Sequence, residues 1–178
     1  MITMTFIEKK IKKLLKEKAI DYQEFEHEPV YTCEVADKVR KRIEESDQDD
    51  SRKSGIKNLL FETVDGKFIL TLGLGNKKID EEKIKTLEKT KFIRLARPKD
   101  VEKTIGCPIG CVPPFGHKKQ IKTYIDKQLL ESDYLYFNPG NHSKTIKIRA
   151  KDLLKLIEEP IIYEWWLWKK SKFRWQEG

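Results

Sequence analysis

Residues 106–116 constrain this chain more than any other segment, because they pack three glycines and three prolines into eleven residues. Glycine permits backbone angles that other residues avoid, whereas proline fixes φ and removes an N–H donor. Helix and strand patterns fill the sequence on both sides of the segment. A plain connector needs far fewer special residues. We therefore expect a rigid loop that presents backbone amides and carbonyls to a ligand.

The composition bounds the class of protein and its partners. The 178 residues suffice for one domain with a sizeable core. The 37 basic and 29 acidic residues give a net charge of +8, which favours a polyanion such as nucleic acid as partner, although excess lysine also serves solubility. No apolar run is long enough to span a membrane, and lysines interrupt residues 7–19, where a signal peptide needs an apolar stretch. Three cysteines are a sparse, odd set, which predicts a reducing cytoplasm.

Helix and strand patterns alternate irregularly along the chain. Helical spacing and capping residues predict helices over residues 5–19, 32–45, 80–89, 98–105 and 152–159. Period-two patterns and apolar runs predict strands over residues 22–26, 58–64, 67–72, 92–96, 120–125, 134–138 and 144–149. A polar, non-periodic stretch at 44–55 predicts a mobile loop. The mixture predicts an α+β fold whose mixed, largely antiparallel sheet is surrounded by helices.

The end of the chain differs from the rest. We expect a single domain over residues 1–160 and an extension over 161–178, which holds all four tryptophans of the protein interleaved with lysines. Tryptophans flanked by cations such as Lys169 and Lys170 suit single-stranded RNA, and a membrane-surface anchor uses the same residues. Because tryptophan is highly buried on average, we expect at least two of the four to pack on the domain.

Several side chains are candidates for chemistry. Lys57 directly precedes an apolar strand, which would hold its ammonium group rigidly toward a cleft. His27 and His142 are candidate general bases; hydrogen bonding to the surrounding structure is the expected role of His27. His117 adjoins Lys118 and Lys119, and we expect the three to form a basic rim facing RNA. Zinc binding by Cys107 and Cys111, completed by Cys33 or His117, is less favoured than structural or pocket-lining thiols, because no second ligand pair lies close in sequence.

Five segments, in order, resemble the YbaK/ProX family of aminoacyl-tRNA editing domains, which is related to the insertion domain of bacterial prolyl-tRNA synthetases. They are His27-Glu-Pro-Val-Tyr-Thr32, Lys57-Asn-Leu-Leu-Phe61, Gly110-Cys-Val-Pro-Pro114-Phe-Gly116, residues 125–129, and Phe137-Asn-Pro-Gly140-Asn-His142. The resemblance covers residues 6–158. It implies a trans-acting deacylase that hydrolyses the ester of a mischarged tRNA, with no cofactor and no metal. The partners implied are tRNA and an aminoacyl-tRNA synthetase, with no membrane.

The resemblance also implies roles for individual residues. Lys57 matches the functional lysine that engages the 3′ end of the substrate. The loop residues expected to shape the aminoacyl pocket are Gly110, Cys111, Val112, Pro113 and Pro114, and further substrate-binding residues are Thr32, Asn138, Gly140 and His142. Lys118, Lys119, Lys169 and Lys170 are expected to bind RNA. Two departures concern specificity: many relatives carry a smaller residue in place of Cys111, and the polar stretch at 44–55 is longer than in compact members.

The chemistry of editing agrees with these features. An apolar pocket separates substrates that differ by one methylene by only about 1–3 kcal/mol, so synthetases need a second sieve. An aminoacyl ester is already activated, so positioning and oxyanion stabilisation suffice without a Ser-His-Asp triad. We expect a small substrate side chain such as alanine, with cysteine and serine as rivals, on tRNA-Pro. The alternatives are a non-catalytic tRNA-binding or synthetase-associated module and, less favoured, a peripheral membrane protein.

Overall fold

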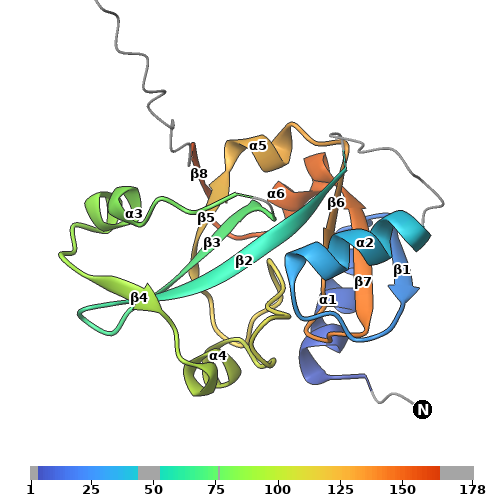
Figure 1. The fold of residues 1–178 in the computed structure, drawn as a ribbon, viewed down its shortest axis with the longest axis horizontal. Helices are drawn as coiled ribbons and strands as arrows, with labels where there is room; N and C mark the ends of the chain where they lie inside the picture. Colours follow the sequence, from blue (N-terminus) through green and yellow to red (C-terminus); the bar gives the residue numbers. More distant parts are fainter. Residues whose placement is uncertain (1–3, 44–52, 76, 165–178) are drawn as a thin grey trace, which may run out of the picture.

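A computed structural model describes residues 4–43, 53–75 and 77–164, in which the strands form one mixed sheet (Figure 1). The sheet order is β1-β7-β6-β2-β3-β5-β8, and β4 pairs with β2 beside this path. The strands are β1 Tyr22–Glu26, β2 Lys53–Thr63, β3 Phe68–Leu74, β4 Ile93–Leu95, β5 Lys122–Asp126, β6 Tyr134–Phe137, β7 Lys144–Arg149 and β8 Ile161–Tyr163. The helices are α1 Phe6–Glu17, α2 Cys33–Ile43, α3 Glu81–Glu88, α4 Pro98–Thr104, α5 Lys127–Leu130 and α6 Leu153–Leu156, with a 3-10 turn at Ala150–Asp152.

The long strand β2 connects the two parts of the sheet. Its first residues pair in parallel with β6, its last residues pair antiparallel with β4, and β3 runs antiparallel along most of its length. Figure 1 shows β2 running diagonally through the molecule, with β4 and α3 at one end and α1, α2, β1 and β7 at the other. The α+β class with a mixed sheet is therefore confirmed.

Helix α1 closes one side of the main core. Thr5 begins the helix, because its hydroxyl accepts a hydrogen bond from the Glu8 N–H at 3.2 Å. The apolar side chains of Ile7, Ile11 and Leu15 are fully buried, as helical spacing predicts for one face. These side chains belong to the same core cluster as Leu60 of β2 and residues of the Gly/Pro loop.

A buried ion pair fixes α1 to the sheet. Glu8 of α1 has no exposed surface, and its Oε1 lies 2.7 Å from Nζ of Lys144 in β7, which is itself 5% exposed. Glu24 of β1 lies 3.7 Å from the same ammonium group. The hydrogen bond that Lys144 donates to Glu8 raises the pKa of Lys144, which favours the charged ammonium form.

The structure differs from the sequence predictions at several boundaries. Strand β2 begins within the predicted polar loop, because residues 53–55 pair with β6. The predicted helix over 152–159 is limited to short turns, and α5 was not predicted. Residues 161–163 form β8 in parallel with β5, so the sheet extends past the expected boundary at 160. Trp165, Trp166, Trp168 and Trp175, with Lys169 and Lys170, lie outside the described residues. Among the described helices, none has the length and apolarity needed to cross a membrane.

Candidate functional site

The Gly/Pro loop, residues 106–116, connects α4 to the approach to β5 and carries three glycines with positive φ. Gly110 has φ +88° and packs closely against His142, which lies in the loop between β6 and β7. A Cβ on Gly110 would lie only 3.1 Å from Cε1 of the His142 ring. Glycine is therefore required at residue 110 for two reasons: the backbone angle is positive, and the His142 ring leaves little room for a side chain.

The loop is fixed by hydrogen bonds to its carbonyl groups. The side-chain amide of Asn58 in β2 donates to the Val112 carbonyl at 2.8 Å, and Nε2 of His117 bonds to the Pro113 carbonyl at 2.7 Å. The side chains from Cys111 to Pro114 are buried. The Cys111 thiol lies in the main core and donates to the Pro108 carbonyl at 3.3 Å. The loop is consequently a rigid wall rather than a flexible connection.

The backbone N–H groups at the centre of this loop remain available. Those of Gly110, Cys111 and Val112 form no hydrogen bond with any residue of the described ranges. Unpaired backbone donors in a rigid loop are the groups that stabilise a developing oxyanion. The expectation that the loop offers backbone donors to a ligand thus has a geometric basis, and its function remains a prediction.

His142 is held in one tautomer by the loop that precedes α2. Its Nδ1 lies 2.9 Å from the Val30 carbonyl oxygen, and its own carbonyl accepts from the Val30 N–H at 2.9 Å. A carbonyl oxygen only accepts, so Nδ1 carries the proton and Nε2 of the neutral ring carries a lone pair. Nε2 would lie 3.9 Å from a Cβ on Gly110. The structure therefore brings together Gly110 and His142, which the sequence placed in separate motifs.

Asn58 is a site residue that the sequence analysis did not select. Its Nδ2 holds the Val112 carbonyl, while its Oδ1 is buried without a hydrogen-bond partner in the described chain. A buried polar atom without a partner is costly and is found where a ligand or water completes it. The one feature of the sequence that could have identified Asn58 is a single amide side chain directly before the apolar residues Leu59 and Leu60.

Lys57 lies on the neighbouring position of β2, opposite Gly73 of β3. Successive side chains of a strand point to opposite faces, so Lys57 leaves β2 on the face away from Asn58 and the Gly/Pro loop. It is half-buried and forms no hydrogen bond or ion pair with the described residues. Gly73 has no side chain to cover its stem. The role of Lys57 at the 3′ end of a substrate stays a prediction.

Three other predicted residues have structural partners. The Thr32 hydroxyl accepts from the Val35 N–H at 3.2 Å and so caps α2. Asn138 donates to the carbonyls of Asn141 and Lys144 and thereby shapes the β6–β7 loop. Gly140 has φ +83°, and a Cβ there would lie 2.3 Å from Cγ2 of Ile7 in α1. Contacts of these residues with substrate remain predictions.

His117 does not belong to the expected basic rim, because it is buried beneath the loop. Its pKa is lowered from 6.5 to about 4, mainly by burial; the bond to the Pro113 carbonyl opposes this shift, and the positive charge of Lys10 adds to it. His117 is therefore neutral and holds the loop in place. Lys118 and Lys119 are exposed, and the stem of Lys118 lies across Gly106.

The remaining histidine and the thiols serve the structure. Both ring nitrogens of His27 are engaged, Nδ1 at 2.7 Å from the Glu28 carbonyl and Nε2 at 2.8 Å from the Thr145 hydroxyl. Cys107 and Cys111 are buried side by side, and the hydrogen bond that the Cys107 thiol donates to Cys111, together with burial, raises the pKa of Cys107. Cys33 is exposed at the start of α2. No group of three metal-ligating side chains occurs in the described part of the chain.

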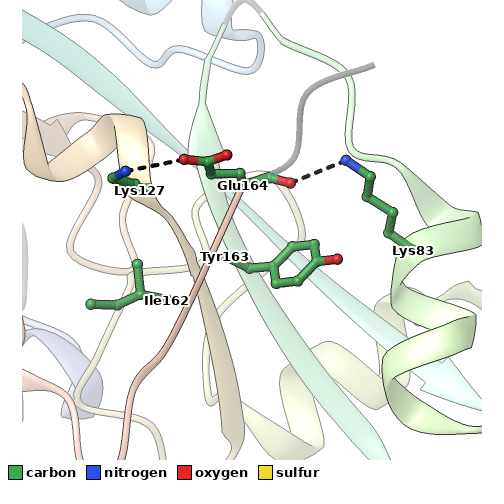
Figure 2. Close-up of a pocket in the computed structure, with 5 residues that line it drawn as sticks. All are labelled: Lys83, Lys127, Ile162, Tyr163 and Glu164. Carbon is green, nitrogen blue, oxygen red and sulfur yellow. Dashed lines mark hydrogen bonds and ion pairs between the residues drawn. The ribbon is translucent and has the colours of Figure 1, made fainter. Parts of the chain in front are cut away.

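A cavity of about 360 Å³ lies beside β8, away from these residues (Figure 2). It is lined by Lys83, Lys127, Ile162, Tyr163 and Glu164. Figure 2 shows both lysines directed at Glu164: Lys127 pairs with its carboxylate at 3.1 Å, and Lys83 donates to its carbonyl at 3.2 Å. None of the residues predicted to act on substrate lines this cavity.

Comparison with known proteins places these features in a family. The family model of the aminoacyl-tRNA editing domain matches residues 27–156, which include β2, the Gly/Pro loop and His142. A solved structure described as a candidate trans-editing enzyme for prolyl-tRNA synthetase superposes with a TM-score of 0.73 at 21% identity, covering 91% of this chain and 98% of that one. This similarity supports the fold.

The chain is also similar to curated proteins. The multifunctional Ser/Thr-tRNA deacylase ProXp-y of Escherichia coli K12 is 23% identical over 84% of this chain and 87% of its own length. The prolyl-tRNA editing protein ProX of Acetoanaerobium sticklandii is 26% identical, over 81% and 86%. The proline–tRNA ligase of Thermotoga neapolitana is 34% identical over 52% of this chain, which spans only 17% of that ligase. The chain belongs to the YbaK/ProX family of aminoacyl-tRNA editing domains.

Proposed function

We propose that this protein is an aminoacyl-tRNA deacylase that acts in trans and hydrolyses the ester between a small amino acid and a mischarged tRNA, with tRNA-Pro as the favoured carrier. The single observation that carries the proposal is the packing of Gly110, in a loop whose central backbone N–H groups have no partner in the described chain, against the ring of His142. Family membership supports the same reaction class.

In this proposal the loop and His142 have different roles in ester hydrolysis. The N–H groups of residues 110–112 stabilise negative charge on the ester carbonyl oxygen. Nε2 of His142 takes a proton from the attacking water, either directly or through the adjacent ribose hydroxyl of the substrate. The bond between the carbonyl carbon and the ribose oxygen then breaks, and the ribose oxygen receives the proton. The products are the free amino acid and uncharged tRNA.

The pocket selects by size in this proposal. Val112, Pro113 and Pro114 are buried, and Asn58 and His117 hold the carbonyl groups of Val112 and Pro113, so the wall cannot move aside for a larger side chain. Rigid walls exclude bulky groups more effectively than they reject smaller ones. Small aminoacyl groups such as alanine, cysteine or serine are therefore the expected substrates.

The RNA is held by cations outside the pocket. Lys57 provides a half-buried ammonium group in the middle of β2, on the face away from Asn58, where it would bind a phosphate near the 3′ end, and Lys118 and Lys119 provide an exposed pair beyond the loop. The protein has a net charge of +8, so binding to tRNA should weaken steeply as salt is added. An aminoacyl-tRNA synthetase is a further partner that would deliver the mischarged tRNA.

The decisive experiment is a panel of mischarged tRNAs. Each is incubated with the protein, and release of the amino acid is compared with spontaneous hydrolysis. Release of one or more small amino acids supports the proposal. Binding of tRNA without release of any amino acid would instead support the non-catalytic module, and cleavage restricted to bulky aminoacyl groups would contradict the pocket assignment.

A further inference from the structure

Tyr31 is an exposed aromatic side chain at the rim of the candidate site. Its exposed fraction is 69%, the largest of any aromatic residue in the described ranges. Its ring centroid lies 4.5 Å from that of His142, with the planes tilted by 40°. Its carbonyl oxygen would lie 4.0 Å from a Cβ on Gly110. The ring therefore borders the place where the ester is proposed to react, while most of its surface faces water.

The backbone on both sides of Tyr31 is fixed. Val30 exchanges two hydrogen bonds with His142, one through the ring and one through the main chain. Thr32 caps α2 through its hydroxyl, and its carbonyl accepts from the Ala36 N–H at 3.0 Å. An exposed ring on a fixed backbone loses little entropy when a ligand covers it. No hydrogen bond of the Tyr31 hydroxyl to another described residue accounts for its position.

We propose that Tyr31 is a stacking platform for the base of the nucleotide that carries the amino acid, the terminal adenosine of tRNA. This inference rests on the proposed action on tRNA. The ester is attached to the ribose of that nucleotide, so its base must lie one sugar away from His142 and Gly110. Aromatic side chains recognise unpaired bases at RNA ends by stacking on their faces. Tyr31 is thus a positioning residue that holds the terminal nucleotide beside the loop, equally before and during the chemical step.

Binding of RNA to variants of the protein tests this platform without any need for hydrolysis. Two labelled RNA acceptor-stem helices are used, one ending in CCA and one ending in CC, and their dissociation constants are measured by fluorescence anisotropy. The parent protein should bind the CCA end about tenfold more tightly, which is within the range for one stacked base. Tyr31→Ala should bind both RNAs equally, at the affinity that the parent has for the CC end.

Two further variants complete the design. Tyr31→Phe keeps the ring and should retain the preference for the CCA end. Tyr22→Ala removes an exposed tyrosine of β1, which is 39% exposed and distant from the loop, and should also retain it. In deacylation assays Tyr31→Ala should raise KM about tenfold and leave kcat nearly unchanged, because stacking contributes equally before and during the chemical step.

The outcomes separate this inference from the proposed function. Equal affinity of the parent for the two RNA ends overturns the platform alone. A loss of affinity for both ends in Tyr31→Ala also overturns it, because the residue would then support the structure rather than the base. Absence of any RNA binding by the parent overturns both the platform and the proposed function.

Discussion

The candidate site and the cavity beside β8 differ in two respects: how much empty volume each contains, and whether its polar groups have hydrogen-bond partners. The cavity is hollow, but its lysines are engaged: Lys127 pairs with the Glu164 carboxylate, and Lys83 bonds to the Glu164 carbonyl (Figure 2). At the Gly/Pro loop the walls are closely packed, yet Oδ1 of Asn58 and Nε2 of His142 have no partner within the described residues. Because a buried polar atom without a partner is costly, Oδ1 of Asn58 is better evidence for a ligand at the loop than empty volume is for one beside β8.

The largest expected effect on the deacylation rate comes from replacing His142, the proposed general base of the candidate site. Replacement by alanine removes the proposed base without disturbing a buried core side chain, so deacylation should fall by at least about a hundredfold. Rates are measured with the preferred mischarged tRNA, and folding is checked by thermal melting. Lys127→Ala in the cavity is the matched control and should leave the rate unchanged. An equal loss in both variants would remove the distinction between the two regions.

His117 provides a pH test of the loop wall. Its pKa in the folded state is about 4, below the ordinary value of 6.5, so the unfolded chain binds the additional proton. The contribution of neutral His117 to the free energy of unfolding should be fully present above pH 6.5. It should be lost as the pH is lowered toward 4, which reduces the free energy of unfolding by up to about 3 kcal/mol. Urea unfolding across this window measures the change. His117→Gln keeps an N–H donor but cannot titrate, and its stability should depend less on pH than that of the parent.

A pair of glycine substitutions separates backbone strain from damage to the site. Gly110 and Gly66 both have positive φ, +88° and +74°, but only Gly110 has a neighbour within 4 Å of the added Cβ. Alanine at either position should cost about 1 kcal/mol of stability. Only Gly110→Ala should also reduce deacylation, because its methyl group meets the His142 ring. A parallel loss of activity in Gly66→Ala would mean that strain alone explains the effect.

The smallest effect for which we predict a change in rate is that of Lys57. Its half-buried ammonium group has no partner in the described chain, unlike that of Lys83 in the cavity. Lys57→Ala should fold normally and deacylate about tenfold more slowly, equivalent to about 1.4 kcal/mol. Lys83→Ala serves as the comparison and should retain the parent rate. A fully active Lys57→Ala variant would exclude this lysine from the reaction.

Local signals in the sequence predicted much of the fold. Asp80 caps α3 as its sequence context predicted, Asp65-Gly66 joins β2 to β3 as a hairpin, and Thr5 caps α1. These features depend on residues close in sequence. Strand β8 and the parallel pairs of β2 with β6 and of β3 with β5 depend on partners far along the chain, which periodicity does not reveal.

The site was predictable in part for the same reason. The Gly/Pro loop was predicted from its glycine and proline content. Lys57 and His142 were selected through the family resemblance. The contacts of Gly110 with His142 and of Tyr31 with His142 join separate motifs, so no spacing reveals them. His117 was misjudged because two adjacent lysines indicated a surface, whereas its ring turns inward to the Pro113 carbonyl. Asn58 was overlooked because its partner, a backbone carbonyl, leaves no signal in the sequence.

The ion pair between Glu8 and Lys144 sets an order of events during synthesis of this protein. The two residues are 136 positions apart, so the carboxylate of α1 leaves the ribosome long before its counterion. Docking α1 on an incomplete sheet would bury the Glu8 carboxylate without Lys144, leaving Lys12 of the same helix, 3.6 Å away, as its counterion. Loss of one partner of a buried ion pair costs about 3–5 kcal/mol, so we expect α1 to dock stably only after β7 has been made. Because Lys144 follows directly on the loop that carries His142, that loop is already synthesised when the N-terminal helix docks.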